Sequence, residues 1–452
     1  MRRPPYASVA LLGLAVLAVA LLVACGADRG KASEPRPRDV PTPTAAGDGG
    51  ADSVVVFYAT DRERFEPSLR WYLARFAWPA GVLALGLLVV ARVRRVLAAP
   101  FRWRAAVLRW MVVATGAVLA AKGAYECVRM AQRTARVEVL YGDERFQAVG
   151  DGLPLRLGAC RVSIPPTHVV GAVEQPSMWT GDWFEDPARH MVVFGAKERD
   201  EARWFDDLRA VVAGSTKEDA FVFVHGYNVT FEEAVLRTAQ IAYDLKFEGA
   251  AVTYSWPSQG GYAQYPIDEA NVRWSTPHLE RFLAALRDRS GAKRVHLVAH
   301  SMGNRALTEA LQRLRGKGAT DAKPVFSEVV LAAPDLDADT FREDIAPAIL
   351  GAAERTTLYA STHDKALLVS RGLHGAPRAG EAGEGIVVVP GLDTIDVSSV
   401  SGSHSYIGDN GRVLDDLGAL LKDRLATPRR NGLVERAARG LRFWVLEALG
   451  AK

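Results

Sequence analysis

The chain has 452 residues, with 56 Lys and Arg against 52 Asp and Glu and a formal net charge of +4 at pH 7. This slight surplus of positive charge gives no case for nucleic-acid binding, which needs a concentrated basic surface. Three cysteines do not make a disulfide framework. The sequence lacks both a Cys/His group with zinc spacing and a phosphate-binding glycine loop, so we expect neither a metal nor another cofactor.

The amino-terminal residues 1–25 predict an export signal. Two arginines precede an apolar stretch at residues 9–24, and small residues follow as far as Cys25, which is the layout of a secretory signal. The sequence Leu-Val-Ala-Cys at 22–25 resembles a bacterial lipobox, and this resemblance implies cleavage and lipidation at Cys25. The alternative is an uncleaved anchor. Residues 26–52 are rich in Pro, Gly, Asp and Ala, which predicts a flexible linker.

The first strand of a folded domain is expected within residues 53–62, and an insertion follows at 63–137. The insertion holds two apolar stretches, 76–91 and 105–121, each shorter than the roughly 20 residues that span a bilayer. An arginine-rich segment joins them, which favours a cytoplasmic position for that segment. We therefore expect a two-helix transmembrane hairpin in the inner membrane, with the rest of the chain periplasmic. Amphipathic helices that cover the folded domain are the alternative.

The most informative stretch is residues 294–304. A strand-like apolar run at 295–299 leads into Ser301, and Gly303 follows ahead of a helical pattern. A sharp turn from strand to helix raises a serine hydroxyl above the edge of a sheet. The usual pattern is Gly-x-Ser-x-Gly, and here Ala299 stands at the position of the first glycine. Ser301 is therefore the candidate nucleophile.

A second strand-like run, residues 220–224, ends in a His-Gly pair. In proteins with this serine turn, such a loop offers one backbone N–H to an oxyanion, and the residue after the nucleophile offers the other. We therefore expect the N–H groups of Tyr227 and Met302 to form the oxyanion hole. Three neighbouring residues are expected to brace or line the site: His225, Gly226 and His300.

Seven short segments resemble those of bacterial members of the α/β-hydrolase (esterase/lipase-like) superfamily, in particular a family of largely uncharacterised function. They are FYATD at 57–61, YGDER at 141–145, CRVSIPP at 160–166, FVHGYN at 223–228, YSWPS at 254–258, AHSMGN at 299–304 and AAPD at 332–335. The resemblance covers residues 53–62 and 138–425. It implies the α/β-hydrolase fold, a mostly parallel sheet with helices on both faces, and a serine-hydrolase mechanism. It implies no particular substrate.

In this fold the triad runs along the chain as serine, acid, histidine. Two strand-like runs after the serine end in acids, and Asp364 is favoured because the later strand is the commoner position. Asp335 is the alternative, followed by Asp337. His404 is the expected base, since it lies in a small-residue loop between a strand-like and a helical run. His374 lies too close to Asp364 to leave room for a strand between them.

The last segment, residues 427–452, has apolar residues at helical spacing and is expected to form an amphipathic helix that packs on the α/β-hydrolase domain of residues 138–426 or lies on the membrane. These features predict a membrane-anchored serine hydrolase that cleaves small-molecule or lipid acyl esters through an acyl-enzyme. An acyltransferase with the same triad and a non-catalytic scaffold in a membrane complex are the alternatives. The sequence indicates no particular protein partner.

Overall fold

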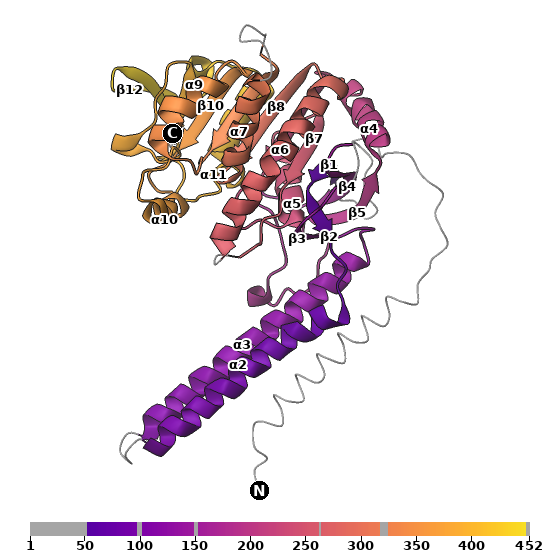
Figure 1. The fold of residues 1–452 in the computed structure, drawn as a ribbon, viewed down its shortest axis with the longest axis vertical. Coiled ribbons are helices and arrows are strands. Elements are labelled where there is room, and N and C mark those ends of the chain that lie inside the picture. The colour runs from indigo at the N-terminus through magenta and orange to yellow at the C-terminus, as the bar shows by residue number, and fades with distance from the viewer. Residues whose placement is uncertain (1–51, 97–101, 149–151, 262–263, 317–323, 449–452) are drawn as a thin grey trace. The chain divides into compact units, whose positions relative to one another are not determined.

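The computed structural model describes residues 52–96, 102–148, 152–261, 264–316 and 324–448 (Figure 1). The predicted export signal, Cys25 and nearly all of the predicted linker lie outside these residues. The described chain divides into two compact units. One consists of residues 65–138 and 175–186, and the other contains the remaining residues.

The larger unit is built on a sheet of eleven strands among the described residues. From one edge to the other they are β12 (Leu433–Ala438), β13 (Leu441–Leu446), β11 (Leu392–Asp396), β10 (Ala353–Ala360), β9 (Phe326–Ala332), β8 (Arg294–His300), β6 (Asp219–Val224), β7 (Ala250–Ser255), β1 (Asp52–Thr60), β4 (Arg156–Ile164) and β5 (Val192–Arg199). Every pair from β13 to β1 is parallel. The pairs β12–β13, β1–β4 and β4–β5 are antiparallel. A separate pair joins β2 (Arg62–Arg64) to β3 (Tyr141–Arg145).

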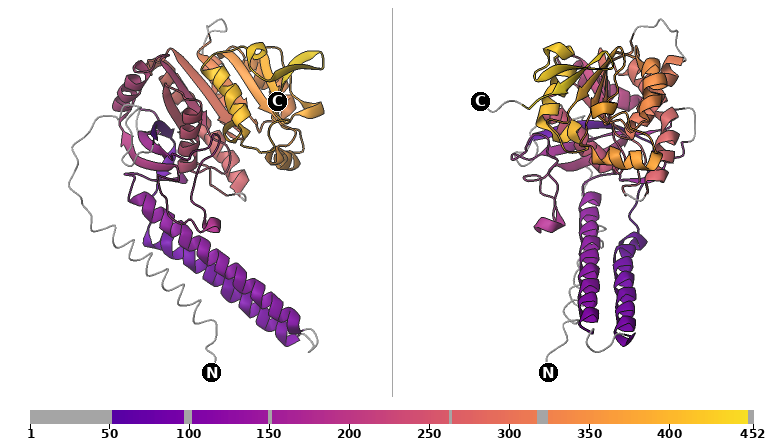
Figure 2. Two further views of the ribbon diagram at one scale, coloured as in Figure 1. Left: turned by 180° about the vertical axis from the view of Figure 1, so that it is seen from behind. Right: turned by 90° about the vertical axis from the view of Figure 1, so that its left-hand side faces the viewer.

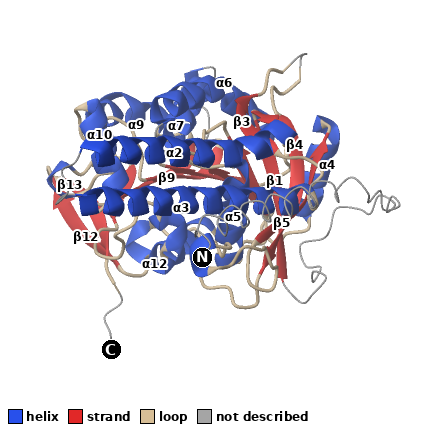
Figure 3. Ribbon diagram, turned by 90° about the horizontal axis from the view of Figure 1, so that it is seen from below, coloured by secondary structure: helices blue, strands red, loops and turns tan. Residues whose placement is uncertain are grey.

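Helices cover both faces of this sheet (Figure 3). One face carries α4 (Glu201–Ala213), α6 (Tyr265–Arg289), α7 (Gly303–Gly316) and α9 (Ala346–Ile349), and the other carries α5 (Phe231–Asp244) and α12 (Gly411–Leu421). The shorter elements are α8 (Ala338–Thr340), η5 (Phe341–Ile345), α10 (Lys365–His374), η6 (Gly383–Gly385), α11 (Tyr406–Asp409) and η7 (Thr427–Arg429). This arrangement confirms the predicted fold class.

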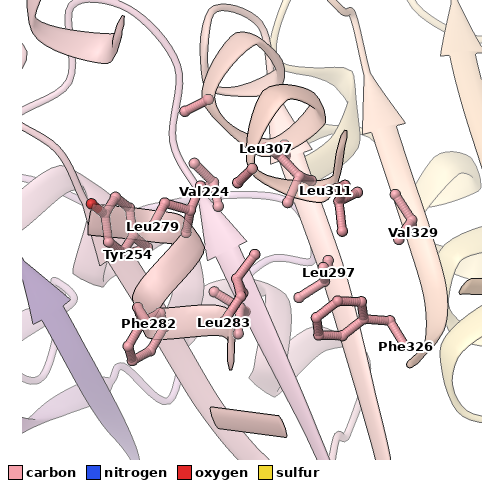
Figure 4. Close-up of a cluster of buried hydrophobic side chains, with 14 of the residues drawn as sticks. Val224, Tyr254, Leu279, Phe282, Leu283, Leu297, Leu307, Leu311, Phe326 and Val329 are labelled. Atoms are coloured by element: carbon pink, nitrogen blue, oxygen red, sulfur yellow. The ribbon is translucent and has the colours of Figure 1, made fainter. Parts of the chain in front are cut away.

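The central strands are apolar along their whole length because both of their faces are buried. In β6, Val222 and Val224 belong to the core under α6 and α7, whereas Phe221 and Phe223 belong to the core under α5. Successive side chains of a strand point to opposite faces, which explains this division. Figure 4 shows the first of these cores, in which leucines of α6 and α7 lie over β6, β8 and β9.

The predicted helix over residues 427–452 is wrong, because most of this segment forms the β12–β13 hairpin. Its two-residue turn consists of Arg439 and Gly440, with φ of +52° and +77°. Two positive φ values in such a turn match the twist of the flanking strands. Trp444 and Leu446 alternate with exposed or half-buried neighbours and bury against the sheet, where β13 pairs with β11. Strand pairing and burial at the sheet edge, and not the helical spacing of the apolar residues, therefore determine the structure of this segment.

The smaller unit contains two long helices, α2 (Leu69–Val96) and α3 (Arg102–Thr134), which lie side by side in both views of Figure 2. Their segments Leu69–Val93 and Ala106–Thr134 are long and apolar enough to cross a membrane. The predicted insertion is thus helical, and both segments are longer than the apolar stretches that indicated them. Large apolar side chains on these helices are exposed, among them Trp78, Leu85, Leu88, Trp110 and Met111.

Glycines allow the two helices to approach closely. A Cβ on Gly123 would lie 2.3 Å from the carbonyl oxygen of Arg75, and a Cβ on Gly86 would lie 2.5 Å from Cγ1 of Val112. Small residues at helix contacts are typical of membrane helix pairs. Arg75 Nε and Glu126 Oε2, 2.7 Å apart, add an ion pair between the helices.

Residues 175–186, which include η3 (Met178–Thr180), belong to this smaller unit, whereas the sequence placed them in the domain of residues 138–426. The Tyr125 hydroxyl of α3 donates to the Pro176 carbonyl at 2.5 Å. The buried carboxylate of Glu185 accepts from Arg129 Nη2 at 3.2 Å. Contacts over such sequence separations leave no local pattern, so the assignment of residues 175–186 to the smaller unit could not be predicted.

Candidate active site

Ser301 occupies the turn between β8 and α7. Its φ of +51° lies in the left-handed region, where a side chain costs roughly 1–2 kcal/mol. Hydrogen bonds hold the turn in place. The Ser301 N–H donates to the Ala332 carbonyl at 2.9 Å, and Asn304 Nδ2 donates to the carbonyls of both residues at 3.0 Å. The end of β9 therefore fixes the strained turn that carries the serine.

Two glycines are required where the serine turn meets the loop after β6. A Cβ on Gly303 would lie 2.3 Å from the carbonyl oxygen of His225, and a Cβ on Gly226 would lie 2.9 Å from the Cβ of Ser301. Both distances are shorter than any real contact of a Cβ. The absence of these side chains allows the predicted oxyanion loop to lie directly against the serine turn.

Asp364 and His404 form a direct pair. Asp364 follows β10 and caps α10, where Oδ1 accepts the N–H of Leu367 at 3.0 Å. The Nδ1 of His404 lies 2.8 Å from Oδ1 and 2.7 Å from Oδ2. Asp364 is buried, whereas the side chain of His404 is 24% exposed. A carboxylate that binds Nδ1–H leaves Nε2 free of a proton, as a general base requires.

The loop that carries His404, between β11 and α11, is held from two sides. His300 Nε2 donates to the His404 carbonyl oxygen at 3.0 Å, and the two ring centres lie 4.6 Å apart. The Tyr406 hydroxyl donates to the Tyr359 carbonyl at 2.8 Å and accepts the Ala333 N–H at 2.9 Å. Burial, followed by the neighbouring His404, lowers the pKa of His300 to about 3. His300 is therefore a neutral residue that supports the loop.

Ser301, Asp364 and His404 follow β8, β10 and β11, three parallel strands of one sheet region. Their carboxyl ends meet at the same edge, where ligands bind in open α/β sheets. The Ser301 hydroxyl forms no hydrogen bond with His404 in the described structure. Hydrogen bonds between a nucleophile and its general base often form fully only when a substrate binds.

The two predicted oxyanion donors lie on either side of the serine turn. Met302 follows Ser301 and is fully buried, and its N–H donates to no other residue that the structure describes. Tyr227 follows Gly226, the residue that packs on Ser301. Its side-chain hydroxyl donates to the Gly261 carbonyl at 2.9 Å.

Asp335, the alternative acid, has other partners. Its Oδ1 accepts from Arg378 Nε at 2.9 Å and from the Ser370 hydroxyl at 2.5 Å. Its Oδ2 accepts from the Tyr265 hydroxyl at 2.6 Å and from Arg305 Nη2 at 3.1 Å. Although burial alone would raise the pKa of Asp335, the two arginines and these hydrogen bonds hold it below its ordinary value. The geometry thus makes Asp335 part of a structural ion cluster, and the weaker candidate Asp337 caps α8.

Sequence reasoning did not identify the buried polar network beneath the loop of residues 225–229. Its central side chain is Arg62, which is almost fully buried, and Ser255 at the end of β7 is its neighbour. Ser255 lies in the YSWPS segment and Arg62 directly follows the FYATD segment. Neither segment indicated a role for these two side chains, and only the fold brings them together at the site. Among the described residues, no three His, Cys, Asp or Glu side chains group so as to hold a metal ion.

Residues 200–408 match the sequence model of a family described as an alpha/beta hydrolase of unknown function (DUF900). Ser301, Asp364 and His404 all lie within the matched range. The sheet and its helices have the α/β-hydrolase arrangement, and residues 200–408 are similar to this family. No curated protein matches it.

Three solved structures are similar to the chain at low identity. Lipase B of Aspergillus fumigatus has a TM-score of 0.30 and 13% identity, over 48% of this chain and 57% of that one. An uncharacterized protein from Bacillus cereus ATCC 10987 has a TM-score of 0.30 and 11% identity, over 79% and 98%. The acylaminoacyl peptidase of Pyrococcus horikoshii has a TM-score of 0.28 and 11% identity, over 62% and 41%. The chain thus spans little more than half the length of the lipase.

Proposed function

We propose that this protein is a membrane-anchored serine hydrolase that cleaves carboxylic esters with Ser301, His404 and Asp364. The observation that carries the proposal is the pair formed by His404 Nδ1 and the buried Asp364 carboxylate, at the same sheet edge as a serine in a strained strand-to-helix turn. These three groups correspond to a nucleophile, a general base and an acid that orients the base. A non-catalytic scaffold protein would not need these three groups at one site.

The reaction follows from these roles. The Ser301 hydroxyl attacks the acyl carbon while His404 Nε2 takes its proton, and the carbonyl electron pair moves onto oxygen. The N–H groups of Met302 and Tyr227 then stabilise that oxyanion. Collapse expels the alcohol, which takes its proton from His404. Water repeats the sequence on the acyl-enzyme, so the acid is released and the serine is restored.

The membrane anchor is proposed from the smaller unit. Its two apolar helices expose large side chains along their length and pack through glycines, as helices do in lipid. Together with the predicted export signal, these helices support a topology in which both ends of the hairpin and the hydrolase domain are periplasmic and the arginine-rich connection is cytoplasmic. Residues 1–25 are proposed as the signal, with lipidation at Cys25, and residues 26–52 as its linker.

An apolar acyl group is the proposed substrate class. The helix α10, which Asp364 caps, exposes Leu368, Val369 and Leu373. Three exposed large apolar side chains beside a catalytic acid favour a lipid or another acyl ester over a strongly polar substrate.

The proposal is tested with the full chain in detergent. Purified protein should hydrolyse 4-nitrophenyl butyrate, and Ser301→Ala and His404→Ala should each lower kcat by about 10³-fold or more. Full activity in His404→Ala would overturn the triad. A periplasm-dependent reporter should be active when fused after Lys452 and inactive when fused after Val96, and activity at Val96 would overturn the hairpin topology. Faster transfer to an added alcohol than to water would identify an acyltransferase.

A further inference from the structure

We propose that Arg62 and Ser255 are positioning residues that fix the tautomer of His225 and, through it, the orientation of the peptide that carries the Tyr227 oxyanion N–H. The inference rests on the proposed function, because it assigns a role to groups that support the proposed oxyanion hole. Arg62, His225 and Ser255 are each at most 1% exposed, so their polar atoms depend on one another for hydrogen bonds.

The direction of every proton in this network is determined. Arginine has only donors. Arg62 Nε therefore donates to Ser255 Oγ at 2.9 Å. The Gly226 carbonyl oxygen lies 2.8 Å from His225 Nδ1 and can only accept, so the proton of the neutral ring resides on Nδ1 and Nε2 accepts. The Ser255 hydroxyl proton therefore points to His225 Nε2, 3.2 Å away, and Arg62 Nη2 lies 3.5 Å from the same nitrogen.

His225 Nδ1–H donates to the carbonyl oxygen of Gly226 at 2.8 Å. The Gly226–Tyr227 peptide is trans, so its N–H points away from the carbonyl. Since the Gly226 carbonyl is held toward the buried His225 ring, the Tyr227 N–H is held on the opposite side. The packing of Gly226 against Ser301 places this peptide beside the nucleophile.

Other contacts keep the His225 ring and its loop from moving. The ring stacks on Trp256 with centres 5.0 Å apart and planes at 14°, and Trp256 Nε1 donates to the His225 carbonyl at 2.8 Å. Arg62 Nη2 also donates to the Val229 carbonyl at 2.7 Å. Burial and the charge of Arg62 lower the pKa of His225 to about 3. The ring therefore stays neutral across the physiological range, as the relay requires.

The test compares two buried hydroxyls on the same strand. Ser255→Ala removes the donor to His225 Nε2. Thr253→Val is the matched control, because Thr253 is fully buried and its hydroxyl has no partner among the described residues. Loss of a whole oxyanion donor lowers kcat by about 10²–10³-fold. Ser255→Ala leaves the Tyr227 N–H in place but no longer fixes its orientation. We therefore expect kcat with 4-nitrophenyl butyrate to fall by about tenfold, with little change in KM. Thr253→Val should retain the wild-type kcat.

A second readout separates positioning from a loss of structure. Phenylboronic acid forms a tetrahedral adduct with a serine, so its inhibition constant should rise with the fall in kcat while KM stays constant. In a second pair of variants, the Asn amide nitrogen can occupy the place of Nδ1, whereas the Gln amide nitrogen occupies that of Nε2. His225→Asn should therefore retain much more activity than His225→Gln at equal melting temperature.

Two results would overturn the inference: equal kcat and boronate affinity in Ser255→Ala and Thr253→Val, or equal losses in the two His225 variants. Wild-type turnover and its loss in Ser301→Ala are measured first. If they are absent, the proposed function itself fails. If they are present and the Ser255 variant behaves as its control, only the positioning role fails.

Discussion

The carboxylate of Asp364 accepts a hydrogen bond from Nδ1–H of His404, whose Nδ1 lies 2.8 Å from Oδ1 and 2.7 Å from Oδ2. No other basic side chain shares that carboxylate among the described hydrogen bonds and ion pairs, since its remaining partner is the Leu367 N–H. Asp335, only one strand away, instead meets two arginines. Two buried acids near one serine thus have different partners, and this difference separates their expected roles.

Asp364→Asn should lower kcat by about 10⁴-fold, because an amide cannot hold the histidine in the tautomer that accepts the serine proton. Asp335→Asn should leave kcat per folded molecule within about threefold, while the loss of a buried acid beside two arginines lowers the melting temperature. Ester turnover and thermal unfolding of both variants distinguish the two. The reverse pattern would make Asp335 the catalytic acid.

Gly303→Ala should abolish turnover or prevent folding, since its Cβ would lie 2.3 Å from the His225 carbonyl oxygen. Gly372→Ala is the matched control on α10, because a Cβ there meets nothing within 4 Å. The control should be neutral or stabilise the protein by up to about 1 kcal/mol. Yield, melting temperature and turnover are compared. Normal activity in Gly303→Ala would show that the two loops are not in close contact.

The sequence predicted the fold and most of the candidate site because the informative patterns are local. The turn around Ser301, the His-Gly pair before Tyr227 and the small-residue loop around His404 each lie within a few residues. Arg62 could not be found in this way, since it reaches Ser255 across 193 positions. The strand β13 could not be found from local spacing either, because the burial of Trp444 depends on the pairing of β13 with β11.

Glu328→Gln should stabilise the protein more at pH 8 than at pH 5. Glu328 on β9 is buried, neither carboxylate oxygen has a hydrogen-bond partner among the described residues, and burial raises its pKa to about 7. At pH 5 it is protonated when folded and partly ionised when unfolded. As the pH rises toward 7, the unfolded chain releases the proton first, so stability is lost.

Glutamine at this position does not titrate. The difference in free energy of unfolding between Glu328→Gln and the wild type should therefore grow by about 1–3 kcal/mol from pH 5 to pH 8. Thermal unfolding of both proteins across pH 5–8 measures the difference. A benefit that does not change with pH would show that Glu328 does not titrate in this range.

Val369→Asp and Leu373→Asp should lower the hydrolysis of a long-chain ester embedded in lipid vesicles, with little effect on soluble 4-nitrophenyl acetate. Both side chains are about two-thirds exposed on α10 next to the proposed acid, and a charge there opposes contact with apolar substrate. Val169→Asp, at a comparably exposed position, is the control. Equal losses on both substrates would argue against a role of α10 in binding apolar esters.

Labelling with a fluorophosphonate probe tests the central claim most directly, since only an activated serine reacts. The detergent-solubilised full chain should be labelled on a single peptide that contains Ser301. Ser301→Ala should not be labelled, and His404→Ala should react at least about 10²-fold more slowly. The absence of labelling in folded wild-type protein, or labelling at another serine, would contradict the proposed nucleophile and the hydrolase mechanism built on it.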